Sequence, residues 1–190
     1  MRIWHYDDNV NTDQLFPGKY TYTCATPAEI KPHLLEDLDP AFAQAVQPGD
    51  VIVAGRNFGC GSSREQPVVG LKAVGVAAIV AQGFARIFYR AAINQGLLLI
   101  ECPEAVEACN AVAAGQSPDA ARTEPERQRG ASSGSPASVV PLTIDAGGGT
   151  ITVGGRTFTF PKLPPEIMAI RDAGGLLEYT RAKLKARRNR

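Results

Sequence analysis

The chain has 190 residues, enough for one domain that buries a sizeable core without disulfides or metals. Its 44% hydrophobic and 21% charged content is that of an ordinary globular protein, which excludes disordered and fibrous classes. The net charge of +1 combines a body with 14 basic and 19 acidic residues and a tail, 181–190, with six basic residues. Such a tail is most often the solvated end of a helix, and we assign it no function.

The cysteines and the chain start bear on cofactors and location. Cys24, Cys60, Cys102 and Cys109 show neither CxxC spacing nor a paired Cys/His pattern, so they form no recognisable zinc or iron–sulfur ligand set. The first residues lack an apolar signal segment, and no apolar run approaches the ~18 residues of a membrane span. We therefore expect a cytoplasmic protein with reduced thiols, without a membrane or nucleic-acid partner.

The first part of the chain predicts one strand and then helices. Ile3, Trp4 and Tyr6 suggest a short opening strand, and the turn-forming residues of 7–13 predict an exposed polar loop. Segments 27–38 and 40–46 each begin with a proline that suits a first helical turn. Two helices are therefore expected there.

The middle of the chain predicts an α/β unit. Strands are expected at 50–54, 77–81 and 97–101, and helices at 65–74, 85–94 and 103–114, with Gly115 as a stop. This alternation of short apolar runs with longer helical segments is typical of a parallel sheet covered by helices.

The last part of the chain changes character twice. Residues 116–138 are rich in Arg, Glu, Ser, Gly and Pro, which predicts a mobile surface insertion. Glycine turns then separate short runs at 142–145, 150–153 and 156–160, a pattern that predicts a β-meander. A closing helical region is expected from Pro164 onward, interrupted at Gly174-Gly175.

The stretch 55–64, GRNFGCGSSR, is the strongest candidate for a functional site. Its glycines allow the backbone to approach a ligand closely between a strand and a helix, a position that suits anions. The alternative is a simple helix cap, because Ser62 with Glu65, or Ser63 with Gln66, fits a capping box. Pro67 indicates that the helix begins at or after Arg64, so one serine can cap it while the other stays available.

Four motifs together resemble the swivel domain of the aconitase superfamily, in particular the family of 3-isopropylmalate dehydratase small subunits. They are Asn11-Thr12-Asp13-Gln14 with Pro17, Asn57 to Glu65, Phe84 to Arg90, and Gly174-Gly175-Leu176. The resemblance covers nearly the whole chain. It implies a single β/β/α swivelling domain over 1–190 that closes over a separate large subunit carrying a [4Fe–4S] cluster. The expected assembly is a heterodimer in leucine biosynthesis, with a heterotetramer and a catabolic route as the alternatives that the sequence leaves open.

The resemblance also implies roles for the residues of the glycine loop. Ser62 would be the catalytic base, an alkoxide held among N–H groups, and Ser63 would donate to a substrate carboxylate or to the developing enolate-like oxygen. Arg64 would clamp a carboxylate of the hydroxy-diacid substrate, and Gly61 would let the backbone approach it. Gln66 stands where many relatives have histidine, so no proton relay is assigned there.

Substrate choice in this family is associated with the loop that follows the Asn-Thr-Asp motif, here residues 19–23. Lys19, Tyr20 and Tyr22 are therefore candidate substrate-binding residues. Tyr22 aligns where homoaconitase-like members place an arginine, and it carries no charge to compensate a third carboxylate. This favours isopropylmalate or a dimethylmalate-like acid over homoaconitate or citrate.

Three other readings remain open from the sequence. The chain could serve a related dehydratase of the 2,3-dimethylmalate or homoaconitate type, or it could be an anion-binding module without catalysis. It could also be an independent enzyme with Cys60 as nucleophile, although no paired histidine is identifiable. His5 and His33 lie in no metal-like pattern and are assigned no role.

Overall fold

A computed structural model of the chain describes residues 1–117 and 138–188. The strands are β1 (Arg2–Tyr6), β2 (Val51–Ala54), β3 (Ala78–Ala81), β4 (Leu98–Glu101), β5 (Ser138–Val139), β6 (Leu142–Asp145), β7 (Thr150–Val153) and β8 (Arg156–Thr159). The helices are α1 (Thr12–Leu15), α2 (Pro27–Ile30), α3 (Phe42–Ala45), α4 (Gln66–Ala73), α5 (Arg86–Gln95), α6 (Pro103–Ala113), α7 (Pro165–Asp172) and α8 (Leu176–Arg188), with short 3₁₀ helices η1 (Gly18–Tyr20) and η2 (Lys31–His33). Apart from its ends, the predicted insertion at 116–138 lies outside the described residues.

The larger sheet has the strand order β4-β3-β2-β1-β5. The first four strands are parallel, and β5 pairs antiparallel with β1. One register row runs from Trp4 through Ile52 and Ile79 to Leu99, and all four side chains are buried on the same side. The α/β prediction for the middle of the chain is therefore confirmed, whereas the two-residue strand β5 was not predicted.

Alternate residues of the parallel strands point into two different cores. In β2, Ile52 and Ala54 join the core under α4 and α5, while Val51 and Val53 join the core under α6. This period of two is the ordinary consequence of the pleat. A sheet buried on both faces explains why its strands read as continuous apolar runs in the sequence.

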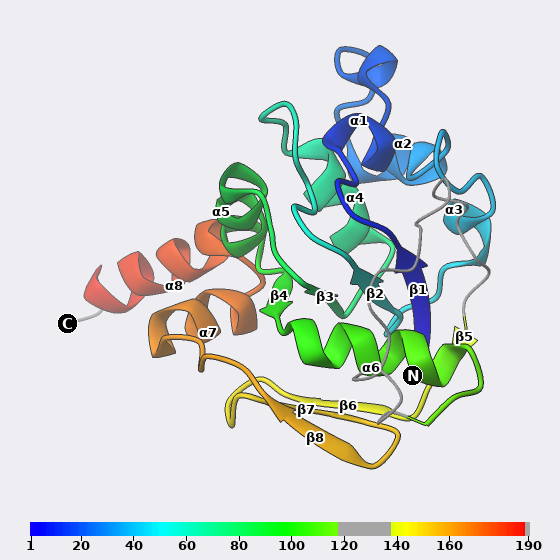
Figure 1. Ribbon diagram of the computed structural model, residues 1–190. Helices are drawn as coiled ribbons and strands as arrows, with labels where there is room; N and C mark the ends of the chain where they lie inside the picture. The colour runs from blue at the N-terminus through cyan, green and yellow to red at the C-terminus, as the bar shows by residue number, and fades with distance from the viewer. Residues whose placement is uncertain (118–137, 189–190) are drawn as a thin grey trace.

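The second core lies between two sheets. Helix α6 covers the far face of the larger sheet and also packs on β7 of the small antiparallel sheet, whose order is β6-β7-β8 (Figure 1). The predicted β-meander is confirmed. The molecule thus layers α4 and α5, the larger sheet, α6, and the meander, which agrees with the predicted β/β/α class.

The two helices predicted before β2 are shorter than expected. Segment 27–38 contains only α2 and the turn η2, because Leu35 adopts a left-handed φ of 55° and donates its N–H to the Leu15 carbonyl instead of continuing a helix. Segment 40–46 contains only α3, which begins at Phe42 rather than at Pro40. The proline-based helix starts were therefore right for α2 and wrong for α3.

The closing helices dock through a glycine contact. Gly96 ends α5 with a φ of 74°, and a Cβ there would come within 2.9 Å of the Gly175 nitrogen. Lys72 of α4 reaches the same place, where its Nζ donates to the carbonyls of Gln95 and Gly174. The predicted interruption at Gly174-Gly175 is therefore the point where the turn between α7 and α8 meets α5. Among the described residues, no helix is long and apolar enough to cross a membrane.

Candidate functional site

The candidate site lies beyond the carboxyl ends of β1, β2 and β3, where ligands commonly bind in open α/β sheets. Two isolated bridges extend the strand pairing past the sheet, Asn11 with Cys60 and Phe58 with Phe84. Backbone hydrogen bonds join the loop after β1 to the loop after β2. The Gly59 N–H donates to the Val10 carbonyl at 2.8 Å, and the Thr12 N–H donates to the Cys60 carbonyl at 2.7 Å. The loop after β1 therefore fixes the loop that carries the serines.

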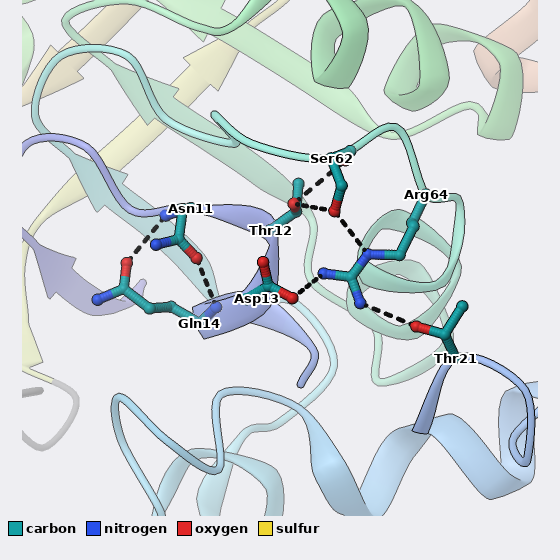
Figure 2. Close-up of polar contacts among 7 residues, drawn as sticks. All are labelled: Asn11, Thr12, Asp13, Gln14, Thr21, Ser62 and Arg64. Carbon is teal, nitrogen blue, oxygen red and sulfur yellow. Dashed lines mark hydrogen bonds and ion pairs between the residues drawn. The ribbon is translucent and has the colours of Figure 1, made fainter. Parts of the chain in front are cut away.

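A capped single turn, α1, presents the residues that face the glycine loop. The Asn11 side chain accepts from the Gln14 N–H at 2.8 Å, and the Gln14 side chain accepts from the Asn11 N–H at 2.9 Å (Figure 2). This reciprocal capping box satisfies two backbone donors that the short helix leaves open. It holds Thr12 and Asp13 beside the serine loop.

The close approach of α1 to the loop requires glycine at position 61. Gly61 has a φ of 103°, and a Cβ there would lie 3.0 Å from the Thr12 hydroxyl. The Thr12 hydroxyl donates to the Ser62 carbonyl at 3.1 Å and lies 3.3 Å from the Ser62 hydroxyl. Thr12 is buried, whereas Ser62 is exposed, so a buried hydroxyl supports an accessible one.

Arg64 organises the polar groups of the site. Its Nε donates to the Ser62 Oγ at 2.9 Å, and its Nη2 donates to the Asp13 Oδ1 at 2.7 Å. Its Nη1 donates to the Thr21 Oγ1 at 3.1 Å (Figure 2). The Arg64 side chain is only 11% exposed, while that of Asp13 is 63% exposed. The guanidinium is therefore held from three sides and still has N–H groups left for a ligand.

The start of α4 differs from a simple capped helix. Its N-cap is Glu65, which makes no side-chain cap bond, so neither predicted capping box forms and that alternative is wrong. Both serines precede the helix, as expected. Among the described residues, no acceptor is found for the backbone N–H groups of Gly61 to Arg64. These donors are consistent with an oxyanion being held at the loop.

The loop 19–23 is anchored to the segment after α2 by Glu36. The Glu36 carboxylate accepts from the Lys19 Nζ at 2.6 Å and from the Tyr20 hydroxyl at 3.1 Å, and it lies 2.8 Å from the His33 Nδ1. The Tyr20 and His33 rings are stacked with centroids 3.8 Å apart. Hydrogen bonds from Lys19 and His33 lower the pKa of Glu36 to about 2, so its carboxylate stays charged at neutral pH.

The structure brings together some of the predicted site residues and not others. Ser62, Arg64 and Gly61 lie together with α1, and Ser63 is exposed beside them without a side-chain hydrogen bond to any described residue. Lys19 and Tyr20, which were predicted to bind substrate, instead bind Glu36 through a salt bridge and a hydrogen bond. Tyr22 is 99% exposed and points away from its own chain's core.

Four further residues shape the site without having been assigned a role from the sequence. They are Thr12, Asp13, Thr21 and Glu36. The motif that contains Thr12 and Asp13 was part of the resemblance, which was the available signal for those two. Thr21 lies in the loop 19–23 that the resemblance associates with substrate choice, but its bond to Arg64, 43 residues away, could not be foreseen. Nothing in the sequence marks Glu36, because its importance depends on contacts with Lys19 and His33.

The described residues offer no site for a metal. They contain no group of three or more His, Cys, Asp or Glu side chains able to hold an ion. Burial raises the pKa of Cys109 to about 12, and Cys60 donates to the Asn9 carbonyl at 3.5 Å. Both histidines are bonded elsewhere, His5 to Asn110 and Ser138 and His33 to Glu36. The Cys60 nucleophile reading therefore lacks a base.

Comparison with known proteins agrees with this geometry. The family model described as the aconitase C-terminal domain matches residues 8–105. A 3-isopropylmalate dehydratase small subunit from Heliobacterium modesticaldum is 38% identical over 96% of this chain and 95% of its own length. One from Moorella thermoacetica is 41% identical over 95% of this chain and 93% of its own length.

A solved structure gives the same result for the fold. The crystal structure of 3-isopropylmalate dehydratase from Methanocaldococcus jannaschii superposes with a TM-score of 0.74 and 32% identity, covering 99% of this chain and 96% of that chain. The layered fold and the serine loop at its strand ends thus define an α/β domain of the aconitase C-terminal type. Within that class, the chain belongs to the family of 3-isopropylmalate dehydratase small subunits.

Proposed function

We propose that this chain acts as the small subunit of a two-chain hydro-lyase that interconverts 2-isopropylmalate and 3-isopropylmalate in leucine biosynthesis. The relatives that match it along its whole length carry that name. The structural observation that carries the proposal is the 2.9 Å bond from the Arg64 Nε to the exposed Ser62 hydroxyl. It pairs a group that can accept a proton with a cation that stabilises the resulting charge.

Ser62 is the proposed base. Its Oγ, as an alkoxide, takes the proton from the carbon beside a substrate carboxylate, and the hydroxyl on the neighbouring carbon leaves with its bonding electrons. The Ser62 hydroxyl then holds that proton and returns it when water adds in the other orientation. The adjacent Arg64 guanidinium favours the alkoxide, because its Nε–H donates to the oxygen. The N–H groups of Gly61 to Arg64, which find no acceptor among the described residues, add positive partial charge to the same loop.

Arg64 is the proposed carboxylate-binding residue. Three of its five N–H groups are used by Ser62, Thr21 and Asp13, which leaves donors on both terminal nitrogens. Asp13 is itself a carboxylate on the exposed side of the fork, so a substrate carboxylate would bind next to it or replace it. Ser63 and the Gly61 backbone, which lie on the same loop as Arg64, would complete the anion site.

The reaction also needs a partner, because a hydroxide is a poor leaving group without a Lewis acid. The described residues contain no group of three or more side chains able to hold a metal ion, and the name of the relatives implies a large subunit. We propose that the large subunit carries a [4Fe–4S] cluster, which when bound would polarise the departing hydroxyl. This chain, acting as one swivelling domain, would contribute the base, the carboxylate clamp and the face that closes over the substrate.

The substrate assignment rests on the absence of charge in the exposed part of loop 19–23. Tyr22 is exposed and neutral, and the nearby Lys19 is neutralised by Glu36. A third carboxylate on the substrate would therefore lose its hydration without gaining a partner. A branched apolar substituent fits this loop better.

The proposal predicts turnover that depends on both chains. The test mixes this chain with a 3-isopropylmalate dehydratase large subunit from the same organism, reconstitutes the cluster without oxygen, and follows formation of the unsaturated acid from 3-isopropylmalate. We expect turnover with the mixture and none with either chain alone. A mixture that assembles and holds its cluster yet leaves 3-isopropylmalate unchanged would contradict the substrate assignment.

A further inference from the structure

The loop 19–23 has two attachments and one free side chain. At one end, Glu36 binds Lys19 and Tyr20. At the other, Thr21 accepts from Arg64 through its hydroxyl at 3.1 Å and from the Gln66 Nε2 through its carbonyl at 3.2 Å. Tyr22 follows directly and is 99% exposed. The position of Tyr22 is therefore set by the loop backbone, which is held by Glu36 on one side and by Arg64 and Gln66 on the other.

The Thr21 attachment connects the loop to the reaction site. Arg64 bonds Thr21 and Ser62 with the same guanidinium, so the loop and the proposed base share one rigid group. Tyr22 follows Thr21, the residue that bonds Arg64, and its side chain is exposed. We therefore take Tyr22 as the residue of this loop that contacts the substrate substituent in the closed assembly.

The Glu36 attachment is the part that can be removed without touching the reaction site. Glu36 contacts neither Arg64 nor Ser62, and it combines a salt bridge, a tyrosine hydrogen bond and a histidine contact on one carboxylate. Lys19 also lies 4.9 Å from the Tyr20 ring centroid, which keeps its ammonium over the ring. Lys19 also lies 4.0 Å from an Asp37 carboxylate oxygen, and Tyr20 stacks on His33. Losing the Glu36 carboxylate would therefore weaken the hold on both residues together without removing every contact.

We infer that Glu36 is a positioning residue that holds loop 19–23 in the conformation that selects the substrate substituent. The inference rests on the proposed function and assigns the role of Lys19 to loop anchoring. When the Glu36 contacts are weakened, only a fraction of the molecules holds loop 19–23 in the substrate-binding conformation. The apparent affinity for substrate then falls in proportion to that fraction. The chemical step is unchanged once the substrate is bound.

The test compares Glu36→Gln with Glu29→Gln in the assembled two-chain enzyme. Glu29 has the same charge and lies in α2, but among the described residues its carboxylate bonds only Ala25 and Thr26. For Glu36→Gln we expect the KM for 3-isopropylmalate to rise about fivefold, with kcat within about twofold, as suits the loss of exposed ion pairs. The KM for 3-methylmalate should change by less than about twofold, because a methyl group offers less apolar surface for the loop to recognise than an isopropyl group. Glu29→Gln should leave the preference between the two acids unchanged.

Two further measurements separate this inference from the alternatives. Adding Lys19→Met to Glu36→Gln should have no additional effect on KM, whereas an additive rise would mean that Lys19 binds substrate directly and would overturn the inference. Tryptic cleavage after Lys19 in the full-length small subunit should be about fivefold faster for Glu36→Gln than for wild type and unchanged for Glu29→Gln. This readout needs neither partner nor cluster.

The outcomes also distinguish the inference from the proposed function. If the wild-type assembly is active and Glu36→Gln keeps its preference for 3-isopropylmalate, the inference is wrong while the function stands. Unchanged cleavage after Lys19 would overturn it equally. If the wild-type assembly does not turn over 3-isopropylmalate, the proposed function is wrong. The role of Glu36 in selecting the substituent of that substrate is then wrong as well.

Discussion

Arg64 shows how a single residue can carry several tasks because of the shape of its side chain. Its Nε, Nη1 and Nη2 donate to Ser62, Thr21 and Asp13 in three directions. A lysine ammonium has the charge but not the fixed fork, so it cannot reach these groups simultaneously. The arginine is therefore required for geometry as well as for charge.

At this scale we predict that Arg64→Lys lowers kcat/KM of the assembled enzyme by roughly 10- to 100-fold, which corresponds to losing one charge-assisted hydrogen bond. Steady-state kinetics with 3-isopropylmalate would measure it. Arg56→Lys is the matched control, because Arg56 pairs with Asp8 on the exposed surface, with bonds of 2.9 and 3.0 Å to one carboxylate oxygen. That change should stay within about threefold. Equal effects of the two substitutions would argue against the carboxylate clamp.

The elements of the fold are held together at a few positions where backbones touch. The contact of Gly96 with the Gly174-Gly175 turn joins α5 to the closing helices, and the Lys72 ammonium bonds carbonyls on both sides of it. A side chain on Gly96 would adopt an unfavourable left-handed conformation and would also collide with backbone atoms, which cannot rotate away.

We expect Gly96→Ala to lower the free energy of unfolding by about 2 to 5 kcal/mol, the sum of left-handed strain and overpacking. Thermal unfolding should show a Tm lower by about 5 to 15 °C. Gly115 provides the control, since it has the same φ of 74° but no atom of the described residues within 4 Å of its added Cβ. Gly115→Ala should therefore show only the strain, about 1 to 2 kcal/mol. A similar loss in both variants would mean that the contact with Gly175 adds nothing.

The elements also show what the sequence could and could not predict. The strands and long helices of the α/β unit were predicted within one or two residues, because apolar runs and glycine stops are local signals. The helix expected at 27–38 was too long, since the left-handed turn at Leu35 depends on a bond to Leu15 on another segment. The two-residue β5 has too few residues to give a pattern of its own and forms only by pairing with β1.

The same division applies to the site. Ser62, Ser63 and Arg64 were predictable because they are consecutive and lie between a strand and a proline-marked helix start. The support from Thr12, Asp13 and Thr21 was not, because it arises from loops that the sheet brings together over 43 to 51 positions of sequence. Glu36 required knowledge of side-chain contacts that no spacing rule contains.

For the molecule as a whole, the arrangement is one half of a reaction site. The serine loop lies at the open end of the sheet, Ser62 and Ser63 are exposed, and Arg64 donates to the Ser62 hydroxyl that we propose as the base, while the described residues contain no group of three or more side chains able to hold a metal ion. Closure against the large subunit would exclude water and strengthen the interaction between Ser62, Arg64 and the substrate. The account therefore makes the chain essential for chemistry, beyond stabilising its partner.

The most direct test of this claim is the turnover of 3-isopropylmalate by the assembled enzyme carrying Ser62→Ala. We predict a loss of at least about 10²-fold in kcat, the usual contribution of a positioned base, with assembly and substrate binding retained. Ser63→Ala should lose only about tenfold, as for one hydrogen bond to a charged group. Full turnover by the Ser62→Ala enzyme would contradict the account, because the base would then have to come from elsewhere.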